Sequence, residues 1–480
     1  MTQEYLWSAH EIASITGGTA SGAWSASGVS INTRTLKVGD LFIAIKGPKL
    51  NGHQFVAEAL KKGASGLIID TIPTNLPEQA PIVLVSDTLD ALHALGKASR
   101  KRSEALIIAV TGSVGKTSTK NALYHALSAQ SQTTCSQASH NNLWGVPLSL
   151  SQMAPEDQFG IFEIGMSHPG EISPLSKMVS PNITIITNVE PAHTENFDSL
   201  ELVAEAKAEI FDGLEENGTA ILNADNKFYS VLKARCKAVG IKNLLTFGSS
   251  NDADTRLISL TSDCQGSNVE ASIQGETICY RVSLPGKHEV MNSLATLTAI
   301  YAAGADIPAA AAALGQLSPL PGRGKRYQLK FFDGSIQLID ESYNANPTSM
   351  RAALDNLGNT EIEPPGRRIA VLGDMRELGR DSESYHLSIA QTILKNQVEK
   401  IFTVGNQMER VFFSLPSKMQ CFSSIDAKGV TKEILKVLRP NDILLIKGSN
   451  AVGMAAIVSE IRAELETYSK TLPGATDNAV

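Results

Sequence analysis

The chain has 480 residues, which predicts roughly three domains of ordinary size. Its 42 basic and 49 acidic residues leave a formal charge of -7, which argues against a general affinity for nucleic acid or anionic membranes, so any phosphate must be held locally. Hydrophobic residues make up 42% and charged residues 19%, which is typical of folded globular proteins and excludes wholesale disorder.

The cysteines and the N-terminal residues indicate the cellular compartment. Neither a disulfide framework nor a cysteine zinc site is predicted, because the five cysteines are widely spaced and form no CxxC pair. No basic segment leads into an apolar run at the start, and no run reaches the ~18 apolar residues that span a bilayer. We therefore expect a protein of the reducing cytoplasm without membrane insertion. The cysteines are Cys135, Cys236, Cys264, Cys279 and Cys421.

Residues 1–86 contain short β-rich runs, such as 41–45 and 66–69, separated by Gly, Pro and Asn. This pattern predicts a small mixed α/β domain. From Asp87 a helical pattern leads to the apolar run 105–110, which is long enough for a buried strand and is followed by glycines. A second domain is therefore predicted from residue 87 to residue 319.

The second domain alternates apolar runs with helical segments, which predicts a mainly parallel α/β sheet. The polar, alternating segment 250–285 favours antiparallel strands, and an alanine-rich helical stretch is expected from Asn292 to about Leu314. The cluster 318–322, rich in Pro and Gly, is predicted to be a linker. The strand candidates of the parallel sheet are 159–166, 182–189 and 218–224.

Residues 320–480 contain four further strand-like runs separated by patterned helices. They predict a second doubly wound sheet in a third, Rossmann-like domain. The predicted fold class is thus α/β with three domains. The four runs are 337–342, 367–374, 400–405 and 441–448.

The sequence TGSVGKTS at 111–118 places glycines between a predicted buried strand and a predicted helix. Such a loop turns backbone N–H groups toward phosphate oxygens, while Lys116 reaches the β- and γ-phosphates and Thr117 can ligate Mg²⁺. Val110 stands where the general pattern has glycine, so this is a shortened variant. The alternative is a chance Gly/Ser turn. The predicted nucleotide-binding residues here are Thr111, Gly112, Ser113, Val114, Gly115, Lys116, Thr117 and Ser118.

Glu163 and His193 each follow an apolar run and therefore lie at predicted strand ends. Glu163 is the only charge of its run, and a carboxylate at this edge of a sheet can complete a Mg²⁺ shell. The alternative is a structural Glu. Taken alone, His193 is more typical of a loop hydrogen-bond partner than of a metal ligand.

Lys207 and several asparagines are ambiguous from the residues alone. Composition favours Lys207 as an exposed helical lysine paired with a neighbouring acid. Asn141, Asn142 and the segment 340–349 put amides and turn residues after apolar runs, as binding loops do, but turn chemistry explains them equally well.

A series of motifs that spans nearly the whole chain resembles, in order, the motifs of the Mur ligase family. Three of them, NNLWGVP, YNANP and LGDMRELG, resemble the family branch that adds D-alanyl-D-alanine, and the DNPR-type motif of the diaminopimelate-adding branch does not occur. The full series is TGSVGKTS, HNNLWGVPLSL, EIGMSHPGEI, TNVEPAHTENF, AKAEIF, LNADN, GKHEVMNSLATL, PGRGKR, DESYNANPTSM, LGDMRELG and LLIKGSN.

This resemblance implies an ATP-dependent amide-bond ligase of peptidoglycan precursor synthesis. Its domains would be an N-terminal UDP-substrate domain, a central ATPase and a C-terminal domain that admits the amine. The implied substrates are a UDP-linked muramyl tripeptide and D-alanyl-D-alanine, joined through an acyl phosphate. We expect the protein to act as a monomer.

The resemblance also implies roles for single residues. Lys116 would hold the phosphates, and Thr117 and Glu163 would bind one Mg²⁺. His193 and Lys207 would serve a second Mg²⁺ site, with Lys207 as a carbamate formed with CO₂, which turns an ammonium into an anionic oxygen ligand.

Further residues are implied to contact the nucleotide and the substrates. Asn292 would contact adenine, and Arg323 and Asp340 would grip the nucleotide. The implied substrate-binding residues are Arg34, Asn141, Asn142, Asn344 and Asn346.

The chain departs from the family pattern at two places. Asn32, Thr33 and Arg34 stand where the family often has Asp-Ser-Arg, which leaves the uridine contacts open. Asn450 stands where this branch commonly has Arg, which leaves open any carboxylate or phosphate contact there.

Two other functions are compatible with the sequence. One is a ligase of the same superfamily that adds a single amino acid to a UDP-muramyl acceptor, or glutamate to a folate. The other is an NTPase switch whose hydrolysis drives partner binding, although no basic partner-binding run is apparent.

Overall fold

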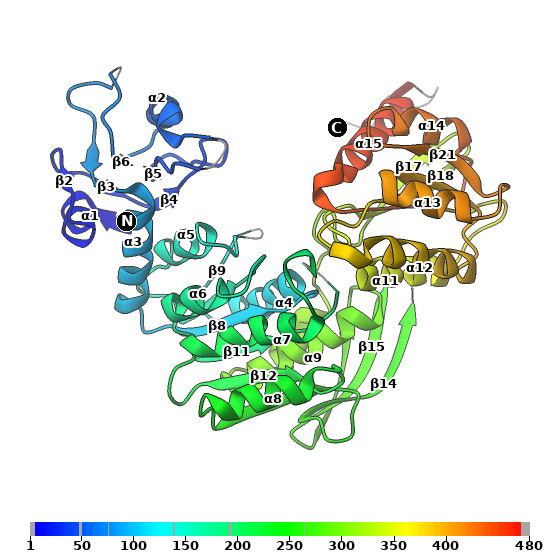
Figure 1. The fold of residues 1–480 in the computed structure, drawn as a ribbon, viewed down its shortest axis with the longest axis horizontal. Coiled ribbons are helices and arrows are strands. Elements are labelled where there is room, and N and C mark those ends of the chain that lie inside the picture. The colour runs from blue at the N-terminus through cyan, green and yellow to red at the C-terminus, as the bar shows by residue number, and fades with distance from the viewer. Residues whose placement is uncertain are drawn as a thin grey trace, which may run out of the picture. The chain divides into compact units, whose positions relative to one another are not determined.

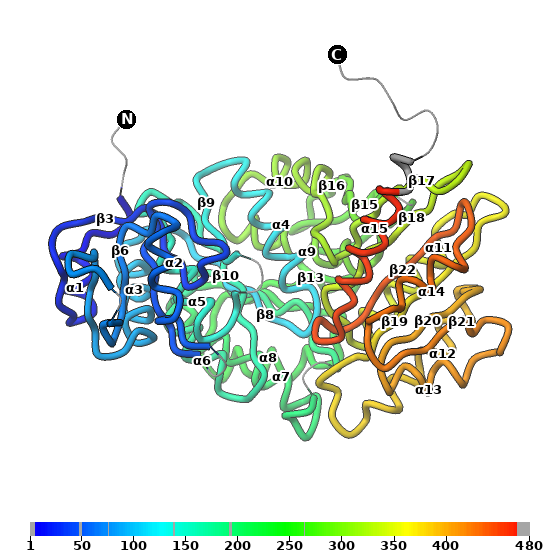
Figure 2. The backbone as a smooth tube through the Cα atoms, turned by 90° about the horizontal axis from the view of Figure 1, so that it is seen from above, coloured from blue at the N-terminus to red at the C-terminus, as the bar shows by residue number. Residues whose placement is uncertain are grey.

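The computed structural model describes residues 5–47, 50–74, 76–137, 140–191, 194–263 and 265–471. No helix within these ranges is both long enough and apolar enough to cross a membrane. The chain forms two compact units, which we describe separately (Figures 1 and 2). Unit 1 comprises Met1–Thr187, Ala204–Arg256 and Leu294–Ala310, and unit 2 comprises Asn188–Val203, Leu257–Ser293 and Ala311–Val480.

The N-terminal part of unit 1 is built on a five-stranded sheet in the order β2-β7-β6-β5-β4, in which only β2 is antiparallel. Successive residues of β5 point to opposite faces, so Leu41 packs with Trp7 while Phe42 packs with Val56. Both predicted runs are confirmed as strands. The elements are β1 (Trp7–Ser8), α1 (Ala9–Thr16), β2 (Thr19–Ala20), β3 (Ser25–Ala26), β4 (Gly28–Ser30), β5 (Asp40–Ile43), η1 (Gly52–Phe55), α2 (Val56–Lys61), β6 (Gly66–Ile69) and β7 (Ile82–Leu84).

The predicted helix after Asp87 is confirmed as α3 (Thr88–Arg102). The Asp87 carboxylate caps it by accepting hydrogen bonds from the backbone of Leu89 and Asp90 at 2.7 and 2.9 Å. Its apolar face packs on the core around Trp7, which also includes Leu148 of α5 (Gly145–Ser151).

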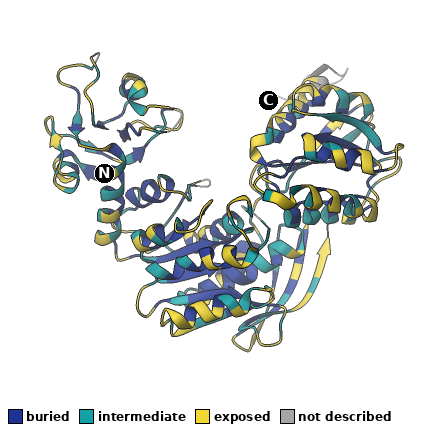
Figure 3. Cartoon of the chain, viewed as in Figure 1, coloured by how far each residue is buried: buried dark blue, intermediate teal, exposed yellow. Residues whose placement is uncertain are grey.

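The second sheet is mainly parallel, as predicted, and its strands in unit 1 have the order β9-β10-β8-β11-β12-β13. Its central strands are buried, as the dark blue arrows in Figure 3 show. The predicted strands 159–166, 182–189 and 218–224 are confirmed. The strands β9 and β13 were not predicted, because β9 is short and β13 begins with one exposed and two half-buried residues. The strands are β8 (Leu106–Thr111), β9 (Thr133–Cys135), β10 (Phe159–Glu163), β11 (Ile183–Ile186), β12 (Thr219–Asn223) and β13 (Asn243–Gly248).

The helices that connect these strands are α4 (Lys116–Ser128), α6 (Ile172–Val179), α7 (Leu200–Ala208), η2 (Thr194–Asn196), η3 (Glu209–Gly213) and α8 (Tyr229–Ala238). The carboxyl ends of parallel strands meet at one edge of a sheet, where ligands of open α/β folds bind. The loops after β8, β9, β10 and β11 therefore lie at the same edge.

The hairpin of β15 (Gly266–Ile273) and β16 (Glu276–Val282) confirms the predicted antiparallel strands, whereas β14 (Thr255–Asp263) begins with a parallel pairing to β13. The single helical stretch predicted from Asn292 to Leu314 is wrong. Two helices occur, α9 (Lys287–Ala302) and α10 (Ile307–Leu314), because Gly304 adopts φ +66° and ends α9.

The C-terminal sheet of unit 2 has the order β17-β18-β22-β19-β20-β21, and Figure 2 shows its last four strands side by side. The four predicted strands are confirmed as β18, β19, β20 and β22, all parallel. The two edge strands were not predicted, because antiparallel β17 and half-exposed β21 lack apolar runs. The strands are β17 (Lys325–Phe331), β18 (Gly334–Glu341), β19 (Arg368–Gly373), β20 (Lys400–Val404), β21 (Gln420–Ser424) and β22 (Ile443–Lys447).

Helices cover both faces of this sheet, as expected for a doubly wound fold. Ala370 and Leu372 of β19 pack on one side with α11, α12 and α13, while Ile369 and Val371 pack on the other with α14 and α15. The helices are α11 (Pro347–Asn359), η4 (Gly379–Asp381), α12 (Ser382–Lys395), α13 (Asn406–Ser414), α14 (Val430–Val437), η5 (Asn450–Val452) and α15 (Met454–Thr471).

Candidate active site

The loop of residues 112–115 connects buried β8 to α4, which confirms the predicted strand, glycine turn and helix. Gly112 and Gly115 adopt φ +150° and +87°, conformations that other residues enter only with strain. Gly115 is the N-cap of α4 and offers no capping side chain, so the first N–H groups of the helix face the loop. This is the geometry that binds phosphate at a helix N-terminus.

Lys116 and Thr187 both form hydrogen bonds to backbone carbonyls of this glycine loop, which we call the phosphate loop. The Lys116 ammonium donates a hydrogen bond to the backbone carbonyl of Gly112 at 2.7 Å, so its side chain folds over the loop. The Thr187 hydroxyl donates to the carbonyl of Val114 at 2.6 Å, and its N–H donates to Thr111 at 3.0 Å. Thr187 was missed by sequence reasoning, although it is the first polar residue after the NITII run.

Glu163 at the end of β10 is held by two side chains from other segments. The Thr117 hydroxyl donates to its Oε2 at 2.7 Å, and the Asn141 amide donates to its Oε1 at 2.7 Å. Glu163 is only 1% exposed. A Cβ at Gly165 would lie 2.8 Å from the Asn141 side chain, so a glycine is needed beside this contact. The predicted Thr117 and Glu163 are thus brought together.

The oxygens of Thr117 and Glu163 suit Mg²⁺, which prefers hard oxygen ligands and usually binds proteins through one or two carboxylates plus substrate phosphates. No cluster of three or more His, Cys, Asp or Glu side chains that could hold a metal occurs in the described part of the chain. The two oxygens of Thr117 and Glu163 fit a Mg²⁺ ion whose other ligands include phosphate oxygens.

The interpretation of Lys207 as an exposed helical lysine is wrong. The residue lies at the end of α7 and is 2% exposed. Burial, together with the positive charge of Lys116, holds the pKa of Lys207 well below its usual value. Its amine is thus readily deprotonated. Two residues later, the Glu209 carboxylate accepts hydrogen bonds from Gly170 at 2.7 Å and from Ile172 and Ser173 at 3.2 and 3.1 Å, which ties this segment to the start of α6.

His193 lies outside the described residues, whereas Glu190 and Glu195 on either side of it form contacts within unit 2. Thr348 at the start of α11 donates a hydrogen bond to Glu190 at 2.9 Å. The N–H of Glu195 donates to the carbonyl of Glu377 at 3.2 Å. Glu190 is therefore bound to the start of α11, and Glu195 to the loop after β19.

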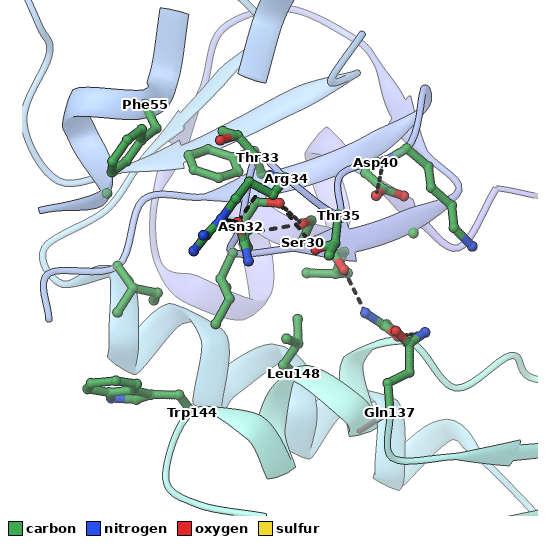
Figure 4. Close-up of a pocket in the computed structure, with 18 of the residues that line it drawn as sticks. Ser30, Asn32, Thr33, Arg34, Thr35, Asp40, Phe55, Gln137, Trp144 and Leu148 are labelled. Atoms are coloured by element: carbon green, nitrogen blue, oxygen red, sulfur yellow. Dashed lines mark hydrogen bonds between the residues drawn. The ribbon is translucent and has the colours of Figure 1, made fainter. Parts of the chain in front are cut away.

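A cavity of about 1090 Å³ lies in unit 1 between the loop after β4 and the loop before α5 (Figure 4). Asn32, Thr33 and Arg34 line one wall, while Gln137 and Trp144 line the opposite wall. The backbone N–H and the guanidinium of Arg34 donate to the Asn32 side-chain oxygen at 3.0 and 3.4 Å. The predicted residue Arg34 therefore faces a cavity large enough for a substrate.

Asn141 and Asn142 take different directions from the same loop. Asn141 reaches Glu163, whereas the Asn142 side-chain oxygen accepts hydrogen bonds from the backbone of Trp144 and Gly145 at 3.2 and 3.0 Å. A Cβ at Gly145 would lie 2.5 Å from the backbone of His140. Asn142 therefore fixes a tight turn that only glycine allows, and this turn carries Trp144 to the cavity.

The predicted nucleotide contacts in unit 2 include Arg323, in the turn before β17, and Asp340 of β18, which bonds to that turn. Asp340 is 4% exposed and accepts hydrogen bonds from the backbone of Gly322 and Ser342 at 2.8 and 3.1 Å. The Arg323 guanidinium lies 4.0 Å from the ring centroid of Tyr343. Asn292, on α9, donates to Glu289 at 3.2 Å.

The asparagines of the 340–349 segment bond to nearby backbone. The Asn344 side chain accepts from the N–H of Ala345 at 2.9 Å, and Asn346 caps α11 through a capping box with Ser349. The Lys447 ammonium donates to the carbonyl of Asn344 at 3.0 Å. Asn450 is exposed at the start of η5.

Three family models match the chain. They are the Mur ligase family catalytic domain over residues 25–101, the Mur ligase middle domain over 110–300 and the Mur ligase glutamate ligase domain over 322–450. The chain belongs to the Mur ligase family and is therefore an ATP-dependent ligase, which removes the NTPase switch from consideration.

Curated relatives that the chain resembles are UDP-N-acetylmuramoyl-tripeptide–D-alanyl-D-alanine ligases. The one from Rickettsia prowazekii is 32% identical, with 94% of this chain and 99% of the relative covered. The one from Bacillus subtilis is 33% identical, with 90% and 93% covered.

Solved structures agree with this likeness. MurF from Acinetobacter baumannii has a TM-score of 0.81 at 26% identity, with 95% of this chain and 99% of that chain covered. MurF from Thermotoga maritima in complex with ADP has a TM-score of 0.74 at 26% identity, with 92% and 98% covered. The predicted three-domain α/β fold class is confirmed, while the boundaries at 86/87 and 319/320 stay predictions.

Proposed function

We propose that this chain joins D-alanyl-D-alanine to a UDP-N-acetylmuramoyl-tripeptide, using ATP and Mg²⁺, in peptidoglycan precursor synthesis. The observation that carries the proposal is the convergence of Thr117, Asn141 and Glu163 beside the phosphate loop, in a chain similar to ligases of that name over nearly its full length. The same loop that brings Asn141 to Glu163 also forms a wall of the cavity.

In the first step, the terminal carboxylate of the tripeptide attacks the γ-phosphorus of ATP, the bond to the β-phosphate oxygen breaks, and ADP leaves an acyl phosphate behind. Carboxylate and triphosphate repel each other, so the site must neutralise charge at the transferring group. Lys116 supplies an ammonium, and the first N–H groups of α4 supply oriented dipoles.

Thr117 and Glu163 would hold Mg²⁺ between them and the phosphates, because their oxygens already lie 2.7 Å apart. The ion, when bound, neutralises phosphate charge and orients the γ-phosphoryl group. Asn141 keeps the second carboxylate oxygen of Glu163 in place, which fixes the direction of the first.

In the second step, the amine of D-alanyl-D-alanine attacks the acyl carbonyl, a tetrahedral intermediate forms, and phosphate departs as the amide forms. The amine loses a proton in this step. Lys116 and the N–H groups of the loop would stabilise the negative charge that develops on the oxygens of the intermediate.

Lys207 would carry a carbamate that serves a second Mg²⁺ together with His193. A neutral amine attacks CO₂, and the product is a carbamate anion and a proton. The burial of Lys207 supports this proposal because it favours the neutral amine that the reaction needs. The carbamate would place an anionic oxygen, which attracts Mg²⁺, at the position where the ammonium of Lys207 would repel it.

The acceptor would bind in the cavity of unit 1, with Arg34 against its diphosphate and the loop of Asn141 and Asn142 beside its peptide. The planar guanidinium of an arginine suits phosphate oxygens. The Arg34 guanidinium lies in the cavity wall, where its Nε donates a hydrogen bond to Asn32. The loop then leads from the cavity to Glu163.

The remaining roles fall in unit 2. Asn292 would contact adenine, and Arg323 and Asp340 would contact the nucleotide, Asp340 by keeping the turn before β17 in shape. Asn344 and Asn346 would border the site of the amine. Asn450 supplies no charge there, so any contact to the dipeptide carboxylate needs another cation.

The test is an assay of the purified chain with ATP, Mg²⁺, UDP-N-acetylmuramoyl-tripeptide and a panel of amines. We expect ADP and phosphate release with D-alanyl-D-alanine, and none with single amino acids or without the tripeptide. Equal turnover without the tripeptide, or with a single amino acid in place of the dipeptide, would refute the proposal.

A further inference from the structure

Lys120 is a buried cation on the helix that follows the phosphate loop. It lies three residues after Thr117 on α4, hence on the same face of the helix, and is 2% exposed. Its ammonium donates a hydrogen bond to the backbone carbonyl of Ser136 at 2.6 Å. Burying an ammonium is unfavourable unless its contacts compensate, so the residue calls for a specific role.

Ser136 connects Lys120 to the end of β10. Its N–H donates to the carbonyl of Ile161 at 2.9 Å, and its hydroxyl accepts the N–H of Glu163 at 3.1 Å. Ser136 is fully buried. The ammonium of Lys120 is therefore two hydrogen bonds away from the backbone of the predicted metal ligand.

The segment that begins at Ser136 returns to Glu163 five residues later through Asn141. One α4 residue, Thr117, binds the Glu163 carboxylate directly, and a second, Lys120, holds the start of the segment that fixes its other oxygen. The charge of Lys120 reaches further along this segment, since it adds to the effect of burial in lowering the pKa of His140. All these contacts lie within unit 1.

We propose that Lys120 is a positioning residue for Mg²⁺: by holding Ser136 it fixes the backbone and carboxylate of Glu163 in the orientation that binds the ion. The inference rests on the proposed function of Glu163 as a magnesium ligand. In this proposal Lys120 acts through Ser136 and not by binding the ion. Groups that orient a metal ligand in this way typically change metal affinity by about 10- to 100-fold when they are removed.

The test is calorimetric titration of the full chain with ADP over a series of Mg²⁺ concentrations and in EDTA. The variant Lys120→Met keeps an unbranched side chain that is one heavy atom shorter and removes its charge and donors. We expect it to need about tenfold more Mg²⁺ for half of the Mg²⁺-dependent gain in ADP affinity. Its ADP affinity in EDTA should stay within about twofold of the unsubstituted chain, because the phosphate loop is unchanged.

Thr119→Val is the matched control. Thr119 is a fully buried neighbour on the same helix, and its hydroxyl has no hydrogen-bond partner among the described residues. Its Mg²⁺ dependence should be that of the unsubstituted chain. Ser136→Ala gives a second probe, which removes the acceptor of the Glu163 N–H and should shift the Mg²⁺ dependence in the same direction as Lys120→Met.

The inference is overturned if Lys120→Met has an unchanged Mg²⁺ dependence, or if it loses ADP affinity equally with and without Mg²⁺. Should Lys120→Met not fold, Ser136→Ala decides alone by the same two criteria. Failure of the proposed function would give a different result, because the unsubstituted chain itself would then show no Mg²⁺-dependent ADP binding.

Discussion

The loops at the carboxyl ends of the two large parallel sheets use their polar side chains differently. In the central sheet, Thr117 and Asn141 reach across 46 and 22 residues to the same carboxylate, that of Glu163. In the C-terminal sheet, Asn344 and Asn346 bond to backbone within three residues. Side chains that meet from distant segments, as at Glu163, form a site that can carry out a reaction. A side chain that bonds to the backbone of its own loop stiffens the loop, and such a loop can lie at the border of a reaction site.

The largest expected effect is on the loop of residues 112–115, where we propose that Lys116 meets the charge of the transferring phosphate. Lys116→Ala should lower ADP production by about 100-fold or more, because it removes a donor that acts on the transition state. The unfolding midpoint should change little. The exposed Lys101 of α3 offers a control, and an equal loss in Lys101→Ala would show that the effect is not local.

The next effect is a pH dependence of stability at Lys207. Because its pKa is lowered in the folded chain, the unfolded chain binds more protons between that pKa and 10.5, and stability should rise with pH through this window. The slope is at most about 1.4 kcal/mol per pH unit. Lys207→Met should remove this slope in CO₂-free buffer. The variant should also be inactive, and added bicarbonate should not restore its activity.

Urea unfolding at several pH values measures this slope. We expect the variant to be more stable than the unsubstituted chain at neutral pH and to lose that advantage as the pH approaches 10.5. Parallel curves for the two proteins would mean that Lys207 keeps an ordinary pKa and is not prepared for reaction with CO₂.

The smallest expected effects are those of two asparagine substitutions, one in each of the two regions compared above. Asn346→Ala should lower the free energy of unfolding by about 1 kcal/mol, because it removes the N-cap and capping box of α11. Asn141→Ala should instead lower ADP production by roughly tenfold. Urea titrations and assays of both variants check the contrast, and a larger activity loss in Asn346→Ala would reverse the assignment of the two regions.

The sequence predicts the parts of the molecule that local patterns determine. The strand, glycine turn and helix around Lys116 follow from adjacent residues, and Glu163 is conspicuous as the single charge of an apolar run. The strands with continuous apolar runs are predicted for the same reason. The edge strands β17 and β21 are not, because one or both of their faces are open and their residues are mixed.

Other features depend on packing that no local pattern encodes. Lys207 has the helical context of a surface lysine, and only the packing around α7 makes it buried. Asn141 and Asn346 both follow loop sequences rich in amides, yet one reaches a distant carboxylate and the other caps a helix. Thr187 and Lys120 were missed because their partners, Val114 and Ser136, are backbone carbonyls of other segments.

The turn of Asn141 to Gly145 has a consequence for how two ligands influence each other. Asn141 contacts Glu163 and Trp144 lines the cavity, with Asn142 holding the short backbone between them rigid. We therefore expect a molecule that displaces Trp144 on entering the cavity to disturb Glu163 as well. Coupled binding is reciprocal. If the molecule in the cavity changes the affinity for the nucleotide by some factor, the nucleotide changes the affinity for that molecule by the same factor. The affinities for the two ligands should then be coupled through the five residues of this turn.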